Sequence, residues 1–188
     1  MNEHETTDAN VSGAAKDKAL LAEGGNVISC RMANRSDDLA GILALAHEAH
    51  HESRFQNICF SVEKATRLAI DAFENPKQNG VMVALRGNKQ VGFAHCSVGE
   101  YFIGTGALLT TVHVLYVSQQ VRQSLAGGRC FLGLLAGLES WSRNRGSSQL
   151  LLHVTGGIEA NRTSRSLART GYAPVGSNFA KPLNRRNN

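Results

Sequence analysis

The stretch LLTTVHVLYVSQQVRQSLAGGRCFLGLLAGLESWSRNR, residues 108–145, decides the fold of this chain. It begins with a β-branched, apolar run that ends at Val117, which predicts a buried strand. Ser118–Arg122 predicts a polar turn, and small residues follow it up to Gly128. The segment after Gly128 places apolar residues on one face of a helix, namely Phe131, Leu134, Leu135, Leu138 and Trp141. We therefore predict a strand, a glycine-rich turn and a long helix.

The junction between this strand and the helix predicts an anion site. The first amides of a helix have no partner within it, and the helix dipole is positive there. Small residues let a phosphate approach those amides, and Arg122 and Arg129 add positive charge beside them. A Walker turn would place Lys-Ser or Lys-Thr after its last glycine, whereas Arg129-Cys130 follows here. The turn also lies too late in the chain, with too few spaced glycines, for a dinucleotide-binding turn.

This turn resembles the acyl-CoA pyrophosphate loop of the GNAT superfamily, the Gcn5-related N-acetyltransferases. In that family a strand ending in hydrophobic-x-Val precedes Arg/Gln-x-x-Gly-x-Gly/Ala, which opens a helix. Here Leu115-Tyr-Val117 precedes Arg122-Gln-Ser-Leu-Ala-Gly127, and Leu125 stands where the first glycine usually lies.

The spacing of apolar residues in the rest of the chain supports the same resemblance over residues 27–183. It predicts the order β, α, α, β, β, β, α, β, α, β, β, which is the element order of that family. The last two strands are expected as a hairpin of Tyr172–Val175 and Asn178–Leu183. The resemblance implies an α+β (three-layer α/β) fold. Its central sheet would be mixed but mostly antiparallel, with about six to seven strands, a splayed central parallel pair and helices on both faces.

Length and composition predict a single domain. The chain has 188 residues, which is enough for one hydrophobic core. Residues 1–25 are polar and predict a flexible tail without a signal peptide, residues 26–184 the domain, and residues 185–188 a basic tail. No apolar run approaches the ~20 residues of a membrane helix. The four cysteines form no C-x-x-C pair, so we expect reduced thiols in a cytoplasmic protein.

The resemblance also implies where acetyl-CoA binds. Its pantetheine arm is expected along the backbone of Leu115, Tyr116 and Val117, where the sheet splays. The residues expected to hold its pyrophosphate are Arg122, Gln123, Ser124, Leu125, Ala126, Gly127, Gly128 and Arg129. Asn161 lies close to the position of a polar residue that contacts pantetheine in the family.

Acetyl transfer to nitrogen needs an amine that is neutral when it attacks, so a general base is expected near the thioester. His113 is our candidate, because it alternates in phase with Leu115 and Val117 and its ordinary pKa suits a base at neutral pH. The alternative is a histidine that only fills the sheet face. Glu100 and His95, on the neighbouring strand, are further candidates. The family's usual acid, a tyrosine, is replaced by Leu167, which leaves the general acid unassigned.

The first helix carries a second pattern, His47-Glu-Ala-His-His51, which matches the zinc-binding sequence H-E-x-x-H. It opens an alternative function, a zinc hydrolase with Glu48 as base. No H-x-x-G-x-x-H extension follows, and seven histidines make a chance match easy. In the GNAT family this segment lies where the acceptor enters, so the resemblance implies a substrate pocket lined by His50, His51 and Glu52, without a metal.

The net charge of +5 fits an anionic substrate such as CoA, and it also admits nucleic acid. Aromatic residues do not interleave with the basic ones, which disfavours nucleic-acid binding. A non-catalytic CoA-binding or nucleic-acid-associated protein of the same fold is a third alternative. We predict a cytoplasmic N-acetyltransferase that uses acetyl-CoA on a small-molecule or protein amine. Homodimers are common in the family, so a homodimer is also expected.

Overall fold

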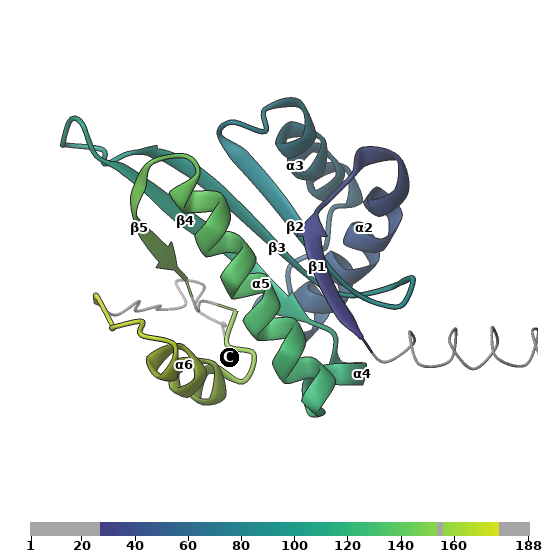
Figure 1. Cartoon of the computed structure of the whole chain (residues 1–188). Coiled ribbons are helices and arrows are strands. Elements are labelled where there is room, and N and C mark those ends of the chain that lie inside the picture. The colour runs from purple at the N-terminus through teal and green to yellow at the C-terminus, as the bar shows by residue number, and fades with distance from the viewer. Residues whose placement is uncertain (1–26, 154–155, 177–188) are drawn as a thin grey trace, which may run out of the picture.

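A five-stranded sheet forms the centre of the computed structural model, which describes residues 27–153 and 156–176 (Figure 1). The strands lie in chain order, β1 (Ile28–Met32), β2 (Asn79–Arg86), β3 (Lys89–Glu100), β4 (Leu108–Val117) and β5 (Ser147–Leu152). Neighbouring strands are antiparallel except β4 and β5, which are parallel because a helix returns the chain between them. The predicted α+β class, with a mostly antiparallel sheet and one parallel pair, is confirmed.

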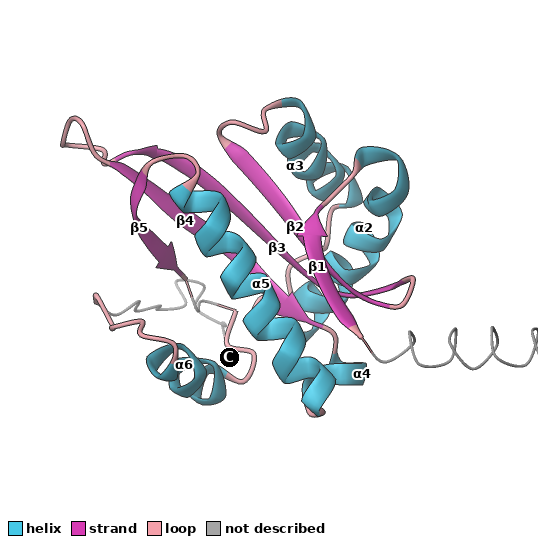
Figure 2. Ribbon diagram, in the orientation of Figure 1, coloured by secondary structure: helices cyan, strands magenta, loops and turns pink. Residues whose placement is uncertain are grey.

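Helices cover both faces of the sheet, as predicted (Figure 2). On one face α2 (Arg35–Glu52) and α3 (Val62–Glu74) pack against a cluster that includes the buried Val83 and Phe93. On the other face α5 (Leu125–Arg143) buries Leu134 and Leu138. Residues 27–153 and 156–176 also contain α4 (Gln119–Arg122), which forms where a turn was predicted, and α6 (Ala160–Arg169). The apolar periodicity of α5 is therefore explained by burial against the sheet.

The predicted closing hairpin does not form in the part of the chain that is described. Tyr172–Val175 has no strand geometry, and Asn178–Leu183 lies outside the described residues, as do the predicted tails. The described sheet thus has five strands rather than six or seven. Tyr172 instead completes the end of α6: its N–H donates to the Leu167 C=O at 3.0 Å and its hydroxyl to Glu139 of α5 at 3.2 Å.

Two β-bulges decide which side chains of β3 and β4 face which helices. In β4 the extra residue is His113, because Cys96 pairs with Val112 whereas the adjacent His95 pairs with Val114. The alternation of side chains is reversed beyond the bulge. Leu115 and Val117 therefore join the core under α5, while Tyr116 joins the core under α2 and α3. The second bulge inserts Val91 into β3.

Gly92 is one residue from the bulge at Val91, whereas Gly99 pairs in register with Leu109. No helix in the described ranges combines the length and the apolar character that crossing a membrane requires. All four cysteines are free thiols.

Candidate active site

The parallel pair β4–β5 is hydrogen-bonded over only part of its length. The register begins at Leu108 and ends where Val112 pairs with Leu152. The His153 N–H, 3.4 Å from the Val112 C=O, is the next contact along the pair. From residue 113 to residue 117, β4 pairs only with β3 among the described residues, so within them β4 has an open backbone edge beside the end of β5. The predicted splay of the parallel pair is present in the structure.

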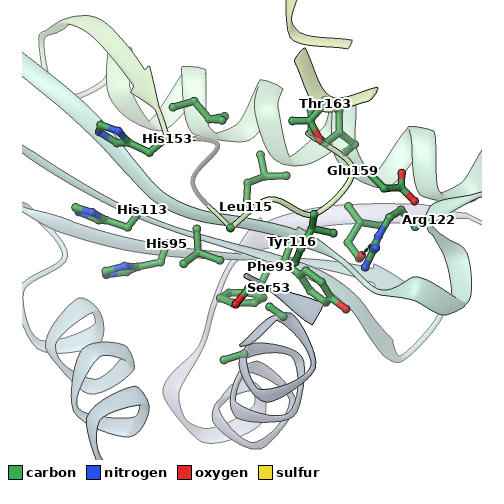
Figure 3. A pocket seen from close by; sticks show the side chains of 18 of the residues that line it. Ser53, Phe93, His95, His113, Leu115, Tyr116, Arg122, His153, Glu159 and Thr163 are labelled. Carbon is green, nitrogen blue, oxygen red and sulfur yellow. Dashed lines mark hydrogen bonds between the residues drawn. The ribbon is translucent and has the colours of Figure 1, made fainter. Parts of the chain in front are cut away.

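A pocket of about 740 Å³ fills this opening and reaches both faces of the sheet (Figure 3). Its part on one face, the α2/α3 chamber, is bounded by α2, by α3, by residues 53–60 and by Phe93 and His95. Its part on the other face, the α5/α6 groove, is bounded by the start of α5, by residues 156–158 and by α6. Residues 113–117 line the passage between the two.

Backbone geometry at the end of β4 identifies the groups that a bound chain can reach. The Ser118 N–H donates to the Val91 C=O of β3 at 2.9 Å. Successive residues of a strand direct their N–H and C=O groups to alternate edges, so Tyr116 also faces β3, whereas Leu115 and Val117 face the opening. The Val117 C=O accepts a hydrogen bond from Arg122 Nε at 2.9 Å. The N–H and C=O of Leu115 are thus available to an extended amide chain, which fits pantetheine.

Hydrogen bonds within the protein engage some of the amides at the start of α5, where the sequence predicted an anion site. Ser124 Oγ accepts from the Gly127 N–H at 3.3 Å, and the Ser124 C=O accepts from the Gly128 N–H at 3.2 Å. Among the described residues no hydrogen bond engages the amides of Leu125 and Ala126. These two amides, together with the helix dipole, suit a phosphate group.

The two adjacent glycines at this helix start have different roles. A Cβ on Gly127 would lie 2.2 Å from the Val121 carbonyl oxygen, so only glycine lets α4 pack against α5. A Cβ on Gly128 would meet nothing within 4 Å, and this exposed residue lines the pocket. Gly127 therefore shapes the turn, whereas Gly128 leaves room beside the free amides.

Arg122, predicted to bind pyrophosphate, forms an ion pair within the protein. Its Nη1 donates to Glu52 Oε2 at 2.7 Å, and its guanidinium lies 5.2 Å from the centre of the Tyr116 ring. The Tyr116 hydroxyl donates to the other Glu52 oxygen at 2.5 Å. Burial raises the pKa of the Glu52 carboxyl, but the bonds from Arg122 and Tyr116 outweigh it, so the net pKa is lowered and the group is charged.

This ion pair corrects two sequence predictions. Glu52 is not part of the described pocket wall and joins α2 to β4 instead of meeting an acceptor. Arg122 does line the pocket, but its charge is balanced by Glu52. Its buried Nη2 has no hydrogen-bond partner among the described residues. Arg129, also predicted to flank the pyrophosphate, is not on the described wall.

His113 lies on the pocket wall, at the bulge of β4. Its Nε2 is 2.7 Å from Ser97 Oγ, and its ring centre is 5.2 Å from that of His95 (Figure 3). The predicted shared face with Leu115 and Val117 is wrong, because the bulge places His113 with His95 and Ser97, on the opposite face.

The surroundings of His113 favour its neutral form. Burial, followed by the charge of the neighbouring His153, lowers the pKa of His113 from its ordinary 6.5. Burial and His113 likewise lower the pKa of His95 to about 4. Figure 3 shows these three histidines at one end of the pocket and Arg122 and Glu159 at the other. A neutral imidazole is the form that accepts a proton at neutral pH.

Several predicted site residues are not brought to the pocket. Glu100 pairs with Leu108 at the far end of β3 and is absent from the described wall. Asn161 borders a separate shallow depression beside Arg165, because α6 directs other residues into the pocket. Leu167, at the position of the family's usual tyrosine, is buried.

The H-E-x-x-H residues are used in packing. Glu48 accepts hydrogen bonds from Ser118 Oγ at 2.9 Å and from the Gln119 N–H at 3.2 Å, so its carboxylate caps α4. The His47 ring packs edge-on against Phe60, with centres 5.1 Å apart. In residues 27–153 and 156–176 no three His, Cys, Asp or Glu side chains are grouped so as to hold a metal ion. Glu48, the base in the zinc alternative, is thus engaged at the start of α4.

The two other histidines of this segment lie differently. His50 lines the α2/α3 chamber, with its Nε2 2.6 Å from the Ile58 carbonyl oxygen. His51 is exposed and lies off the described wall. Of the three residues expected to meet the acceptor, only His50 is in position to do so.

Sequence reasoning missed the contribution of α6 to the wall. Glu159 precedes this helix with φ +43°, the one positive φ among the described non-glycine residues, and its carboxylate lies 3.2 Å from Arg162. Arg162, Thr163 and Arg169 also line the groove. The paired Gly156-Gly157 indicates a turn, but left-handed backbone at a glutamate costs about 1 kcal/mol and has no sequence signature.

The sequence matches no family model and no curated protein. The structure does resemble solved acetyltransferases. An acetyltransferase of Trypanosoma brucei superposes with a TM-score of 0.61 at 16% identity, over 84% of this chain and 100% of that one. A GNAT family acetyltransferase of Staphylococcus aureus gives 0.56 at 17% identity, over 83% and 98%. AAC(6')-Iy in complex with the bisubstrate analogue CoA-S-monomethyl-acetylneamine gives 0.60 at 14% identity, over 85% and 100%. Identities this low make the likeness one of fold.

Proposed function

Because this chain has the fold of the GNAT acetyltransferases, we propose that it is an N-acetyltransferase that uses acetyl-CoA and an amine. One observation carries the proposal: the described pairing of β4 with β5 ends at Val112, and the edge at Leu115 leads into a pocket that reaches Gly127 and Gly128 at the start of α5. An extended amide chain that ends in a diphosphate matches both features.

The donor is proposed to lie along the passage and the α5/α6 groove. Leu115 would hydrogen-bond the pantetheine arm, and the amides of Leu125 and Ala126 would bind the diphosphate beside Gly128. Arg169, on the groove wall, adds positive charge for the remaining phosphate, whereas Arg162 on the same helix is paired with Glu159. The diphosphate is thus proposed to bind at the predicted turn, but a basic side chain of α6 takes the place of Arg122 as its cationic partner.

His113 is proposed as the general base. When its Nε2–H donates to Ser97 Oγ, its Nδ1 keeps a free lone pair, and the lowered pKa keeps the ring neutral at pH 7. Nδ1 would then take a proton from the acceptor ammonium, directly or through a water. The freed amine then attacks the thioester carbonyl of acetyl-CoA, so that a C–N bond forms and the C–S bond breaks, and the second N–H proton passes through water to the departing thiolate.

Water is proposed to protonate the released thiolate. The Tyr116 hydroxyl is hydrogen-bonded to Glu52, and burial followed by that bond raises its pKa, so it is a poor acid at neutral pH. Leu167 has no proton to give. Free thiols at all four cysteines suit the cytoplasm, which we propose as the site of action.

The proposal is tested by mixing the purified protein with saturating acetyl-CoA and a panel of amines, and following thiol release. CoA alone is expected to raise the melting temperature, and at least one amine is expected to release thiol faster than hydrolysis does. A CoA-dependent rise in melting temperature without turnover of any amine would favour the non-catalytic alternative. Absence of both effects would refute the proposal.

A further inference from the structure

The α2/α3 chamber has a mainly apolar wall. Ile42, Leu43 and Leu68 come from the two helices, and Phe60 and Phe93 add aromatic rings. The polar side chains of this wall are His50, His95 and Ser53. Two of these are engaged within the protein, since His50 Nε2 lies 2.6 Å from the Ile58 carbonyl oxygen and Ser53 Oγ donates to the His50 carbonyl oxygen at 2.9 Å.

The chamber wall also lacks negative charge. Among the described wall residues of the whole pocket, the one carboxylate is Glu159, which belongs to the α6 side and is paired with Arg162. The two carboxylates at the end of α2 are engaged elsewhere, Glu48 with Ser118 and Glu52 with Arg122. A substrate with several ammonium groups would give up their hydration here without gaining an ion pair.

We propose that the acceptor is a primary monoamine with an aromatic or branched apolar body, such as a phenylalkylamine. This inference rests on the proposed N-acetyltransferase function and names its substrate class. The apolar body would occupy the α2/α3 chamber, and the amine would point to His113, on the same face of the sheet as Phe93. The body is recognised by burial of apolar surface, which the chamber wall provides.

The rim of the chamber gives a route for such a substrate. Leu68 of α3 is 56% exposed and Phe55 is 43% exposed, and both line the pocket. These residues therefore lie partly in solvent at the edge of the wall, where a new charge is tolerated by the fold. Leu68 has a matched neighbour in Val62, an apolar residue of the same helix that is 59% exposed and lies off the described wall.

The first test compares binding of phenethylamine and spermidine to the full chain by calorimetric titration, with and without CoA. Phenethylamine is expected to bind at least tenfold more tightly than spermidine. Equal binding, or tighter binding of spermidine, would overturn the inference whatever the turnover. With acetyl-CoA, kcat/KM is expected to follow the same order, as measured by thiol release.

The second test uses Leu68→Glu with Val62→Glu as its control. Leu68→Glu is expected to reduce the preference for phenethylamine over spermidine at least fivefold, because it places a carboxylate on the wall, whereas Val62→Glu leaves the preference unchanged. An equal effect of the two variants would refute the assignment of the chamber. If the unaltered enzyme acetylates spermidine in preference to phenethylamine, the substrate class is wrong but the proposed acetyl transfer stands. If the unaltered protein binds phenethylamine but acetylates neither amine, only the proposed function is refuted.

Discussion

The Arg122 guanidinium donates to the Glu52 carboxylate at 2.7 Å and so joins residues 70 positions apart in the chain. The ion pair links the last turn of α2 to the segment that follows β4. The Tyr116 hydroxyl binds the same carboxylate, and Arg122 Nε also holds the Val117 C=O. One cluster of contacts therefore sets the position of the helix that bounds the chamber and of the strand edge that borders the groove.

Glu52→Gln is expected to lower the free energy of unfolding by about 2 kcal/mol, because it leaves the largely buried Arg122 without its counter-charge. Urea unfolding followed by the fluorescence of Trp141 measures this loss. The control is Arg143→Gln, which breaks the more exposed pair with Glu139 and is expected to cost less than about 0.5 kcal/mol. Equal losses in the two variants would show that the buried pair contributes no more than the surface one.

Gly127 and Gly128 are expected to respond differently to the same substitution. Gly127→Ala should lower the free energy of unfolding by about 1–3 kcal/mol, since its Cβ meets the Val121 carbonyl oxygen at 2.2 Å. Gly128→Ala should change it little, or raise it by up to about 1 kcal/mol through helix propensity. Thermal melts of both proteins check the order, and the reverse order would contradict the assigned roles.

Gly128→Glu tests the diphosphate position without the folding defect that a Gly127 variant would bring. Its side chain projects into open space, so the fold should be retained, while its charge and bulk should weaken CoA binding at least tenfold. Calorimetric titration with CoA measures the change in Kd. An unchanged Kd would place the diphosphate elsewhere.

His113→Gln is expected to reduce kcat at least a hundredfold and to leave the CoA-induced rise in melting temperature unchanged. Glu100→Gln serves as the control, because Glu100 lies at the far end of β3, and should retain full turnover. Thiol release at saturating acetyl-CoA and amine measures both. Full activity of His113→Gln would support the alternative that this histidine only fills the sheet face.

The pH dependence of kcat follows from the direction of the His113 shift. Its pKa is lowered below 6.5 by burial and by His153, and the deprotonated form is the active one. At saturating amine, kcat should therefore rise with pH through a pKa below 6.5 and be flat above it. A half-maximal rate above pH 6.5 would contradict this assignment.

His95 should make the protein less stable in mild acid. Its pKa falls from 6.5 to about 4 on folding, mainly through burial, so between these values the unfolded chain binds a proton that the folded protein does not. The free energy of unfolding should thus decrease by up to about 3 kcal/mol as pH falls from 6.5 to about 4. His95→Gln should flatten this slope, and an unchanged slope in that variant would contradict the assignment to His95.

Local patterns in the sequence determined most of the elements. The apolar spacing of Leu134 and Leu138 predicted α5, and Gly171, with φ +89°, follows the end of α6 in the left-handed conformation that favours glycine. The anion site proposed at the start of α5 rests on the small residues that follow the strand. These features depend on residues a few positions apart, which is the range over which periodicity and capping act.

Contacts between distant segments decided the rest. The bulge at His113 reversed the face predicted for that residue, because bulges depend on how two strands pair. Arg122 became the partner of Glu52 rather than of a phosphate, since packing brought α2 against β4. The sequence by itself determined the strand, the turn, the helix and hence the fold class. Only the tertiary structure decided which side chains meet in the pocket. The partner of a charged side chain and the sheet face of a strand residue are set only when the sheet and the helices pack together.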